Sequence, residues 1–169
     1  SALAELATRP IPATPEKETP GATASAPADT PGPPALPADL KKQVQRLRSS
    51  DPAERWEAVG ELGRSANDKV IPYLVPLLKD TDDFVRHHTA EVLGDLDAKQ
   101  ALGALIDALG DEQLFVREMV YVQLRKISRV STIKFEPGAK KEERAKQQRL
   151  WRTWLEENAA KTAEKPAGS

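Results

Sequence analysis

The two histidines of this chain are the residues best suited to metal binding or acid–base chemistry, and they are adjacent. Neighbouring side chains on a helix point about 100° apart, so His87 and His88 cannot both reach one small ligand. His88 and Glu91 are three residues apart and could hold a metal together, but no third ligand stands at a matching spacing. We therefore predict no metal site and interpret both histidines as surface residues that a partner could contact.

Two further sets of residues have side chains that commonly bind ligands. Arg55, Arg86 and Arg117 follow one another at intervals of 31 residues and could bind a phosphate or a carboxylate. Trp151 and Trp154 could stack on a base or anchor a protein, although their helical spacing also suits a packed core. The sequence shows no nucleophile beside a base, no glycine-rich phosphate loop and no carboxylate pair, so we predict neither catalytic residues nor a cofactor.

Composition and charge exclude several classes of function. Cysteine is absent, which excludes a disulfide framework, thiolate catalysis and cysteine-ligated metals. No run approaches the roughly 20 apolar residues that a membrane-spanning helix needs. The net charge is −1, with −3 over residues 1–39 and +3 over residues 138–169. Neither end is the clustered basic surface that binds a phosphate backbone, which argues against nucleic acid as the partner.

The first 39 residues differ in composition from the rest of the chain. They contain nine of the 14 prolines and few large apolar side chains, so they cannot bury enough surface to offset chain entropy. We predict a disordered Pro/Ala-rich linker over 1–39. It would be a solvated spacer, a tether to a membrane or larger complex, or a ligand for a groove that takes proline-rich segments.

The chain begins with Ser rather than Met, from which we infer that an upstream segment has been removed. That segment would be a signal peptide, the product of other processing, or sequence beyond the boundary of the expressed chain. A secreted or periplasmic location would suit the Pro/Ala/Thr-rich start.

From residue 40 to residue 130 the sequence repeats itself every 31 residues. Four apolar columns keep this offset: Leu47 with Leu78 and Leu109, Leu62 with Leu93 and Leu124, Leu40 with Ile71 and Leu102, and Val44 with Val75 and Ile106. Each unit contains two segments of helix period, and a helical pair repeated at this length is typical of a solenoid. The sequence therefore predicts an all-α fold, a short α-solenoid of three two-helix repeats.

Local signals divide each repeat into a first and a second helix. Asp51 is a candidate N-cap and Pro52 fits the first helical position, so a second helix should begin there. Asp82 can cap the second helix of the next repeat, whereas Pro76 removes a hydrogen bond inside the first helix and predicts a kink. The last second helix, over 114–127, is apolar on more than one face and needs cover on more than one side.

The regular pattern stops after the third unit, because Pro137 and Gly138 interrupt the segment where a fourth would begin. The sequence instead predicts a loop and a capping helix over 131–160, followed by a disordered tail over 161–169. The residues expected to cover the third repeat lie in the second half of that helix: Trp151, Trp154 and Leu155.

One pattern in the second repeat consists of Asp80, Val85, Arg86, Ala90, Leu93 and Gly94. It resembles the short HEAT-like repeats of bacteria, the type named after phycobilisome lyases, and the resemblance covers residues 40 to 127. In that family a turn aspartate and a helix arginine of neighbouring units are hydrogen-bonded. The resemblance thus implies a structural ladder of Arg55, Asp80, Arg86, Asp111 and Arg117, and the equal spacing of the two residue types also favours ion pairing over ligand binding.

A second resemblance concerns the end of the chain. Phe135-Glu-Pro-Gly followed by Trp151-Arg-Thr-Trp154 is similar to tails that follow such repeats in bacterial extracytoplasmic proteins.

HEAT-type arrays mostly bind proteins, so the resemblance implies a non-catalytic protein–protein interaction scaffold or an accessory subunit of a larger complex. Two other functions stay open: handling of a chromophore, as in the lyases, and binding of nucleic acid, as in some HEAT-like proteins. In arrays of this family the second helices line the inner surface. A protein partner would therefore contact exposed positions beside the buried stripe: Glu57, Glu61, His87, His88, Glu91 and Asp95.

Met119 and Val122 occupy matching columns of the third repeat, where the other repeats are mostly polar. They predict additional cover, either by the chain's own capping helix or by another protein, and the proximity of that helix in the sequence favours the first.

Overall fold

The computed structural model of the protein describes residues 36–163. The predicted linker up to residue 35 and the predicted tail from residue 164 onward lie outside these described residues. All regular secondary structure in the described part is helical, and it contains no strand, which confirms the predicted all-α class. Its first helix begins at Ala38, preceded by the buried Leu36, so folded structure begins before residue 39, where the predicted linker ends. Its last helix ends at Ala163 and includes residues 161–163, which were predicted to belong to the tail.

Each of the three repeats consists of a first helix and a second helix. The first helices are α1 (Ala38–Arg46), α3 (Ile71–Leu74) and α5 (Leu102–Ala108). The second helices are α2 (Pro52–Arg64), α4 (Asp83–Asp95) and α6 (Leu114–Ser128). Short 3-10 segments flank α3 and α5: η1 (Asp68–Val70), η2 (Val75–Lys79) and η3 (Lys99–Ala101). The chain then continues through a loop into α7 (Lys141–Ala163).

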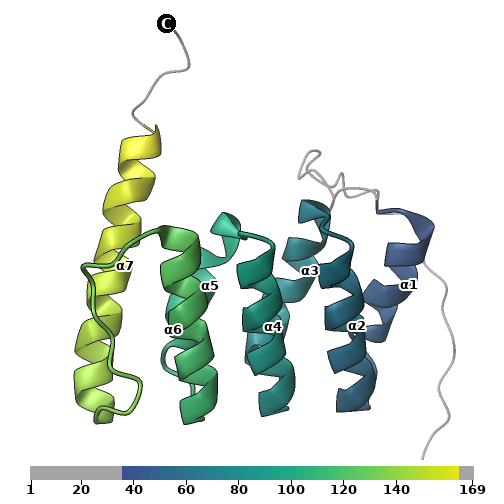
Figure 1. The fold of residues 1–169 in the computed structure, drawn as a ribbon, viewed down its shortest axis with the longest axis horizontal. Helices are drawn as coiled ribbons and strands as arrows, with labels where there is room; N and C mark the ends of the chain where they lie inside the picture. Colours follow the sequence, from purple (N-terminus) through teal and green to yellow (C-terminus); the bar gives the residue numbers. More distant parts are fainter. Residues whose placement is uncertain (1–35, 164–169) are drawn as a thin grey trace, which may run out of the picture. The chain divides into compact units, whose positions relative to one another are not determined.

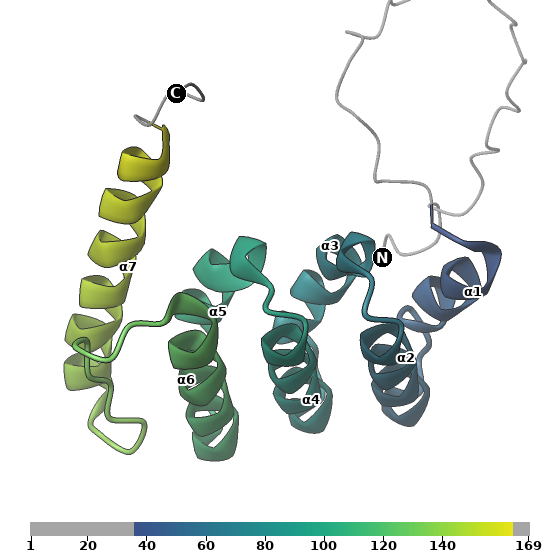
Figure 2. The same ribbon diagram turned by 45° about the horizontal axis from the view of Figure 1, so that its top comes forward.

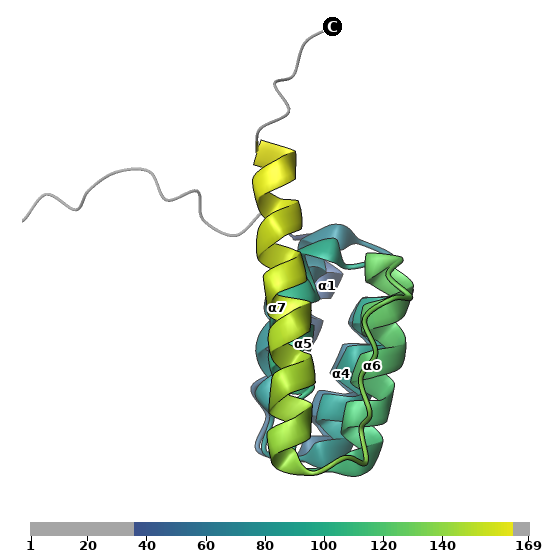
Figure 3. The ribbon, with the colours of Figure 1, turned by 90° about the vertical axis from the view of Figure 1, so that its left-hand side faces the viewer.

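The helices form two layers. The second helices α2, α4 and α6 lie side by side in one layer in Figures 1 and 2, and α4 packs against both of its neighbours. Figure 3 is turned by 90° and shows α1, α5 and α7 together in the other layer. Because α7 packs against α5, it takes the place that the first helix of a fourth repeat would occupy.

The core lies between the two layers and follows the columns predicted from the sequence. The column of Leu62, Leu93 and Leu124 has no exposed area. Apart from Val44 and Val75, which are half-buried, all members of the four columns are buried. Burial of one such side chain stabilises the fold by about 1.5–3 kcal/mol, so the repeated columns help to hold the two layers together.

The ends of the helices follow the predicted caps. The Oδ1 atom of Asp51 accepts a hydrogen bond from the Ala53 amide at 2.9 Å, and that of Asp82 accepts one from the Val85 amide at 3.0 Å. At Pro76 the predicted kink takes the form of a change in helix type, since α3 ends at Leu74 and η2 follows.

Two glycines allow neighbouring second helices to approach closely. A Cβ atom on Gly63 would lie 2.6 Å from Cγ1 of Val92, and one on Gly94 would lie 1.9 Å from Oε1 of Gln123. Gly63 and Gly94 are 31 residues apart, so they occupy the same position in successive repeats. The absence of a side chain at these two positions therefore allows each repeat to stack closely on the next.

Candidate functional site

The first two ladder arginines each join two repeats. Arg55 donates from Nε to Oδ2 of Asp80 at 2.8 Å and from Nη2 to Oδ1 at 2.6 Å, and Arg86 contacts Asp111 in the same way at 2.7 and 3.1 Å. A third nitrogen of each arginine donates at 2.9 Å to a backbone carbonyl in the preceding turn, that of Ser49 or of Asp80. The structure thus brings these arginines to aspartates and carbonyls rather than into one shared ligand site.

The third ladder arginine ends the series differently. Arg117 donates from Nη1 to the carbonyls of Asp111 and Glu112 at 2.8 and 2.9 Å, and from Nε to the carbonyl of Pro137 at 2.8 Å. A backbone carbonyl of the loop therefore replaces the aspartate of a further repeat. Burial, aided by the nearby charge of Arg144, lowers the pKa of Arg117 below its ordinary value.

The ladder contacts favour the charged forms of Arg55, Arg86 and Asp80, as the directions of their pKa shifts indicate. The hydrogen bond to Asp80 raises the pKa of Arg55, and the one to Asp111 raises the pKa of Arg86. Burial on its own raises the pKa of Asp80, but the bonds from Arg55 and from the Asp82 amide outweigh it, so the pKa lies below its ordinary value.

This depressed pKa predicts loss of stability in acid. The ionised Asp80 stabilises the folded state at every pH above the unfolded value of about 3.9, and this contribution disappears as the pH falls through the lower, folded pKa. We expect the free energy of unfolding of the native chain to fall more steeply below about pH 4 than that of the Asp80→Asn variant. Urea titrations between neutral and acidic pH measure this difference. If the free energies of unfolding of the two proteins fell in parallel as the pH was lowered, the stabilising role of ionised Asp80 would be contradicted.

The structure corrects the prediction that both histidines lie open at the surface. The side chain of His88 is only 16% exposed, because its ring stacks on Trp56 of the preceding repeat with centroids 4.3 Å apart. Its Nδ1 atom lies 3.1 Å from Oε2 of Glu91, while its Nε2 atom is buried without a hydrogen-bond partner among the described residues. His87 is half-buried, and its ring centroid lies 5.5 Å from that of Phe115.

The predicted acidic contact residues all lie on the second helices, and three of the four form ion pairs with a nearby arginine or lysine. Glu57 pairs with Arg46 at 2.7 Å, Glu61 with Arg64 at 2.9 Å, and Asp95 with Lys126 at 2.8 Å. Ion pairs as exposed as these contribute about 0–1 kcal/mol, so a partner could replace them at little cost.

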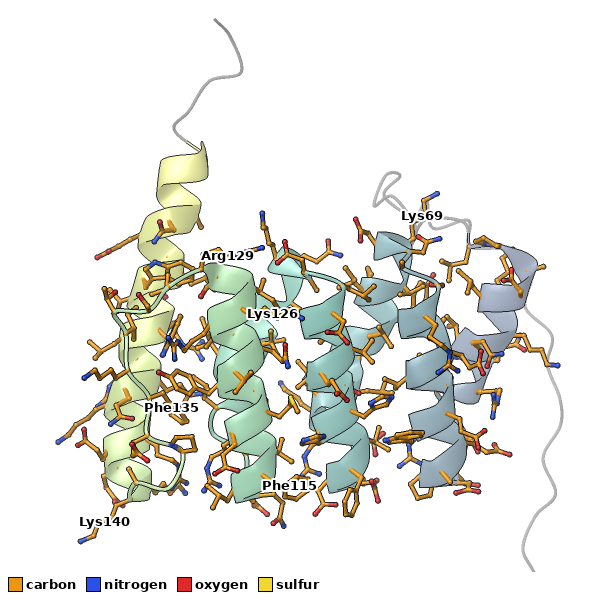
Figure 4. All side chains as sticks on the ribbon, viewed as in Figure 1. Lys69, Phe115, Lys126, Arg129, Phe135 and Lys140 are labelled. Carbon is orange, nitrogen blue, oxygen red and sulfur yellow. The ribbon has the colours of Figure 1, made fainter. Side chains whose placement is uncertain are left out.

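The capping segment reaches the third repeat through a cluster of aromatic rings. Trp151 is fully buried and stands edge-on to Tyr121 and Trp154, at centroid distances of 6.4 and 5.8 Å. The buried Phe135, labelled in Figure 4 on the loop before α7, lies 5.6 Å from Tyr121. Trp154 and Leu155, which were expected beside Trp151, are half-buried.

The cap covers less of α6 than the sequence suggested. Its aromatic rings reach Tyr121, but Val122 remains 59% exposed and Met119 is half-buried. The physical reason is the packing of α7 against α5, which places the capping helix in the layer opposite to these side chains.

We call the outward surface of α2, α4 and α6 the second-helix face. Its exposed or half-buried residues include Trp56, Glu57, Glu61, Phe84, His87, Glu91, Asp95, Leu114, Met119 and Val122. The apolar members Trp56, Phe84 and Leu114 were missed as surface residues in the sequence. For Phe84 the usable signal was its neighbour Val85, which occupies the buried position and leaves Phe84 65% exposed.

The described residues contain no group of three or more potential metal ligands. No described helix combines the length and apolar character needed to cross a membrane.

A family model described as HEAT repeats matches residues 40–125, which is half of the chain. No curated protein matches the sequence.

Proposed function

This chain belongs to the HEAT-repeat family, and on that premise we propose that it is a non-catalytic scaffold that binds another protein through the second-helix face. HEAT repeats commonly mediate protein–protein interaction, and the family is typically non-catalytic. We further propose that the protein is an accessory subunit of a larger complex. The Arg55–Asp80 and Arg86–Asp111 pairs support the finer assignment to the short, phycobilisome-lyase type of repeat.

The observation that carries this proposal is the distribution of exposed apolar side chains. Five large apolar side chains are exposed among the described residues, and four of them lie on the second helices: Trp56, Phe84, Leu114 and Val122. The fifth, Leu150, lies on α7. Apolar side chains gathered on one surface mark interaction sites, and aromatic residues are enriched among those that dominate binding energy.

Aromatic contacts join these side chains across neighbouring helices. Phe84 of α4 lies 5.5 Å from Phe115 of α6, which Figure 4 labels near the N-terminal end of that helix. Trp56 of α2 lies on His88 of α4, with its own ring still exposed. Because both pairs bridge two repeats, the face offers a partner an aromatic surface held in place by the stacking of the helices.

The test compares changes on this face with the same change on α7. The double variant Phe84→Asp with Val122→Asp alters exposed positions, so we expect it to fold, with an unchanged circular dichroism spectrum. The control, Leu150→Asp, introduces the same charge at a position that is 60% exposed. Each tagged chain is incubated with extract of the native source, and retained proteins are quantified by mass spectrometry.

Substituting two side chains that dominate an interface costs at least about 2 kcal/mol, which lowers affinity about 30-fold. We therefore expect proteins retained by the native chain and by Leu150→Asp to be lost with the double variant. If the double variant retains them, or if Leu150→Asp loses them, the second-helix face is not the binding surface.

A further inference from the structure

An open cavity of about 500 Å³ lies beside the C-terminal half of α6. Its apolar lining comes from Tyr121, Val122 and Val130. The charged part of the lining consists of three cationic side chains, those of Arg125, Lys126 and Arg129. The lining contains no acidic residue. Figure 4 shows Lys126 and Arg129 toward the C-terminal end of α6, away from Phe135, which packs beside the preceding turns.

The 31-residue register explains why this cavity exists. Arg125 occupies the position that is Gly63 in the first repeat and Gly94 in the second. At both glycines the next second helix approaches too closely for a side chain, whereas no second helix follows α6 within residues 36–163. The cavity therefore lies at the edge where the second helix of a fourth repeat would pack. The loop before α7 reaches the same edge, with Phe135 beside Tyr121 and with Val130 and Ser131 in the lining of the cavity.

The cations of this edge are weakly engaged within the described residues. Lys126 pairs with Asp95 at 2.8 Å, Arg129 approaches Asp97 at 3.8 Å, and the guanidinium of Arg125 lies 5.8 Å from the centre of the Tyr121 ring. Such exposed pairs contribute little and exchange readily for another carboxylate. Cations in the last turn of a helix also interact favourably with the helix dipole, but that interaction does not require an apolar cavity beside them.

The backbone of Arg129 adopts a left-handed conformation. It has a φ of 61°, in the left-handed region where glycine is favoured because it lacks a Cβ atom. The chain keeps an arginine here, at a conformational cost that glycine would remove.

We propose that this edge of α6 binds a short acidic segment of a partner protein. An apolar side chain of that segment packs on Val122 and Val130, and its carboxylates face Arg125 and Arg129. The inference rests on the proposed function and adds to it the chemistry of the partner. Because residues 122 to 129 span about 10 Å of helix, the segment needs about two helical turns or a few extended residues.

The first test is a selection of random 12-residue peptides displayed on phage, with the whole native chain as bait. We expect the selected peptides to be enriched in Asp and Glu around at least one large apolar residue. Selection on the double variant Arg125→Glu with Arg129→Glu should lose this enrichment. A peptide set without an acidic excess, or the same acidic peptides from both baits, would overturn the proposal.

The second test measures affinity by fluorescence anisotropy with the best selected peptide. Charge reversal of Arg125 and Arg129 should weaken binding at least about tenfold, because it replaces attraction by repulsion. The matched control, Arg48→Glu with Arg64→Glu, changes the net charge equally at two exposed positions, one in the turn after α1 and one at the end of α2. Its affinity should stay within about twofold of that of the native chain. Equal loss in the two variants would mean non-specific attraction and would refute the site.

A third variant separates binding from folding. Arg129→Gly removes the charge and relieves the left-handed backbone, so its melting temperature should equal or exceed that of the native chain while peptide affinity falls. Unchanged affinity in this stable variant contradicts the proposal, as does a single-stranded oligonucleotide that binds this edge more tightly than the peptide. If the native partner depends on Phe84 and Val122 but not on Arg125 and Arg129, the acidic segment is wrong while the scaffold function stands.

Discussion

Replacing Trp151 by alanine should lower the free energy of unfolding by about 3–5 kcal/mol, the largest loss that we expect from any single substitution. The indole is fully buried, and the ring of Tyr121 packs against it. Its removal leaves a cavity where α7 meets the third repeat, and neighbouring helices can fill that cavity only in part. In thermal unfolding followed by circular dichroism, this corresponds to a fall on the order of 10 °C or more.

Two comparisons isolate the cause of this loss. Trp154→Ala removes the same side chain from a half-buried position and should cost clearly less. Trp151→Phe should also cost less than alanine, because the phenyl ring refills part of the cavity that alanine leaves. Loss of the buried Nε1 atom adds little to the cost of either change, since that atom has no hydrogen-bond partner among the described residues. If Trp154→Ala destabilised the chain more than Trp151→Ala, our description of the cap would be wrong.

Replacing Arg86 by alanine should cost roughly 2–4 kcal/mol, between the values for exposed and for buried ion pairs. The substitution removes two bonds to Asp111, one to the carbonyl of Asp80 and a longer one to the carbonyl of Thr81. It also leaves the carboxylate of Asp111 largely buried without its cation, which is the larger part of the cost. Urea unfolding of the native and variant chains measures the difference.

Arg48→Ala is the matched control for this prediction, since Arg48 is an exposed arginine, and the change there should stay within about 0.5 kcal/mol. A variant of Arg86 that unfolds like the native chain but no longer binds its partner would contradict the structural role. It would make the arginine column a ligand site instead.

Much of the fold could be predicted because its determinants are local and occur three times. The columns of Leu62 and its equivalents specify which side of each second helix is buried, and Asp51 and Asp82 mark where second helices begin. A helical pattern of apolar residues in one repeat could be checked against the same positions of the next repeat. Because the three repeats agree, the helix assignments are more certain than a single amphipathic segment would allow.

The candidate site was less predictable because its features depend on contacts between repeats. His88 was expected at the surface, but Trp56 covers its ring from the preceding repeat. The position of α7 was another such case, since the sequence predicted a capping helix that covers Met119 and Val122, whereas α7 joins the layer of the first helices. Packing against α5 leaves Val122 exposed, and that outcome depends on the path of the loop that precedes α7.

Hydroxyl-radical footprinting of the chain, alone and bound to its captured partner, tests the central claim most directly because it reports the exposure of individual side chains. In the unbound chain we expect oxidation of Trp56, Phe84, Leu114 and Leu150, all of which are exposed. In the complex the three residues of the second helices should become protected, while Leu150 on α7 should react as before. Protection of Leu150 with continued oxidation of Phe84 and Leu114 would contradict the account and would place the binding surface on α7.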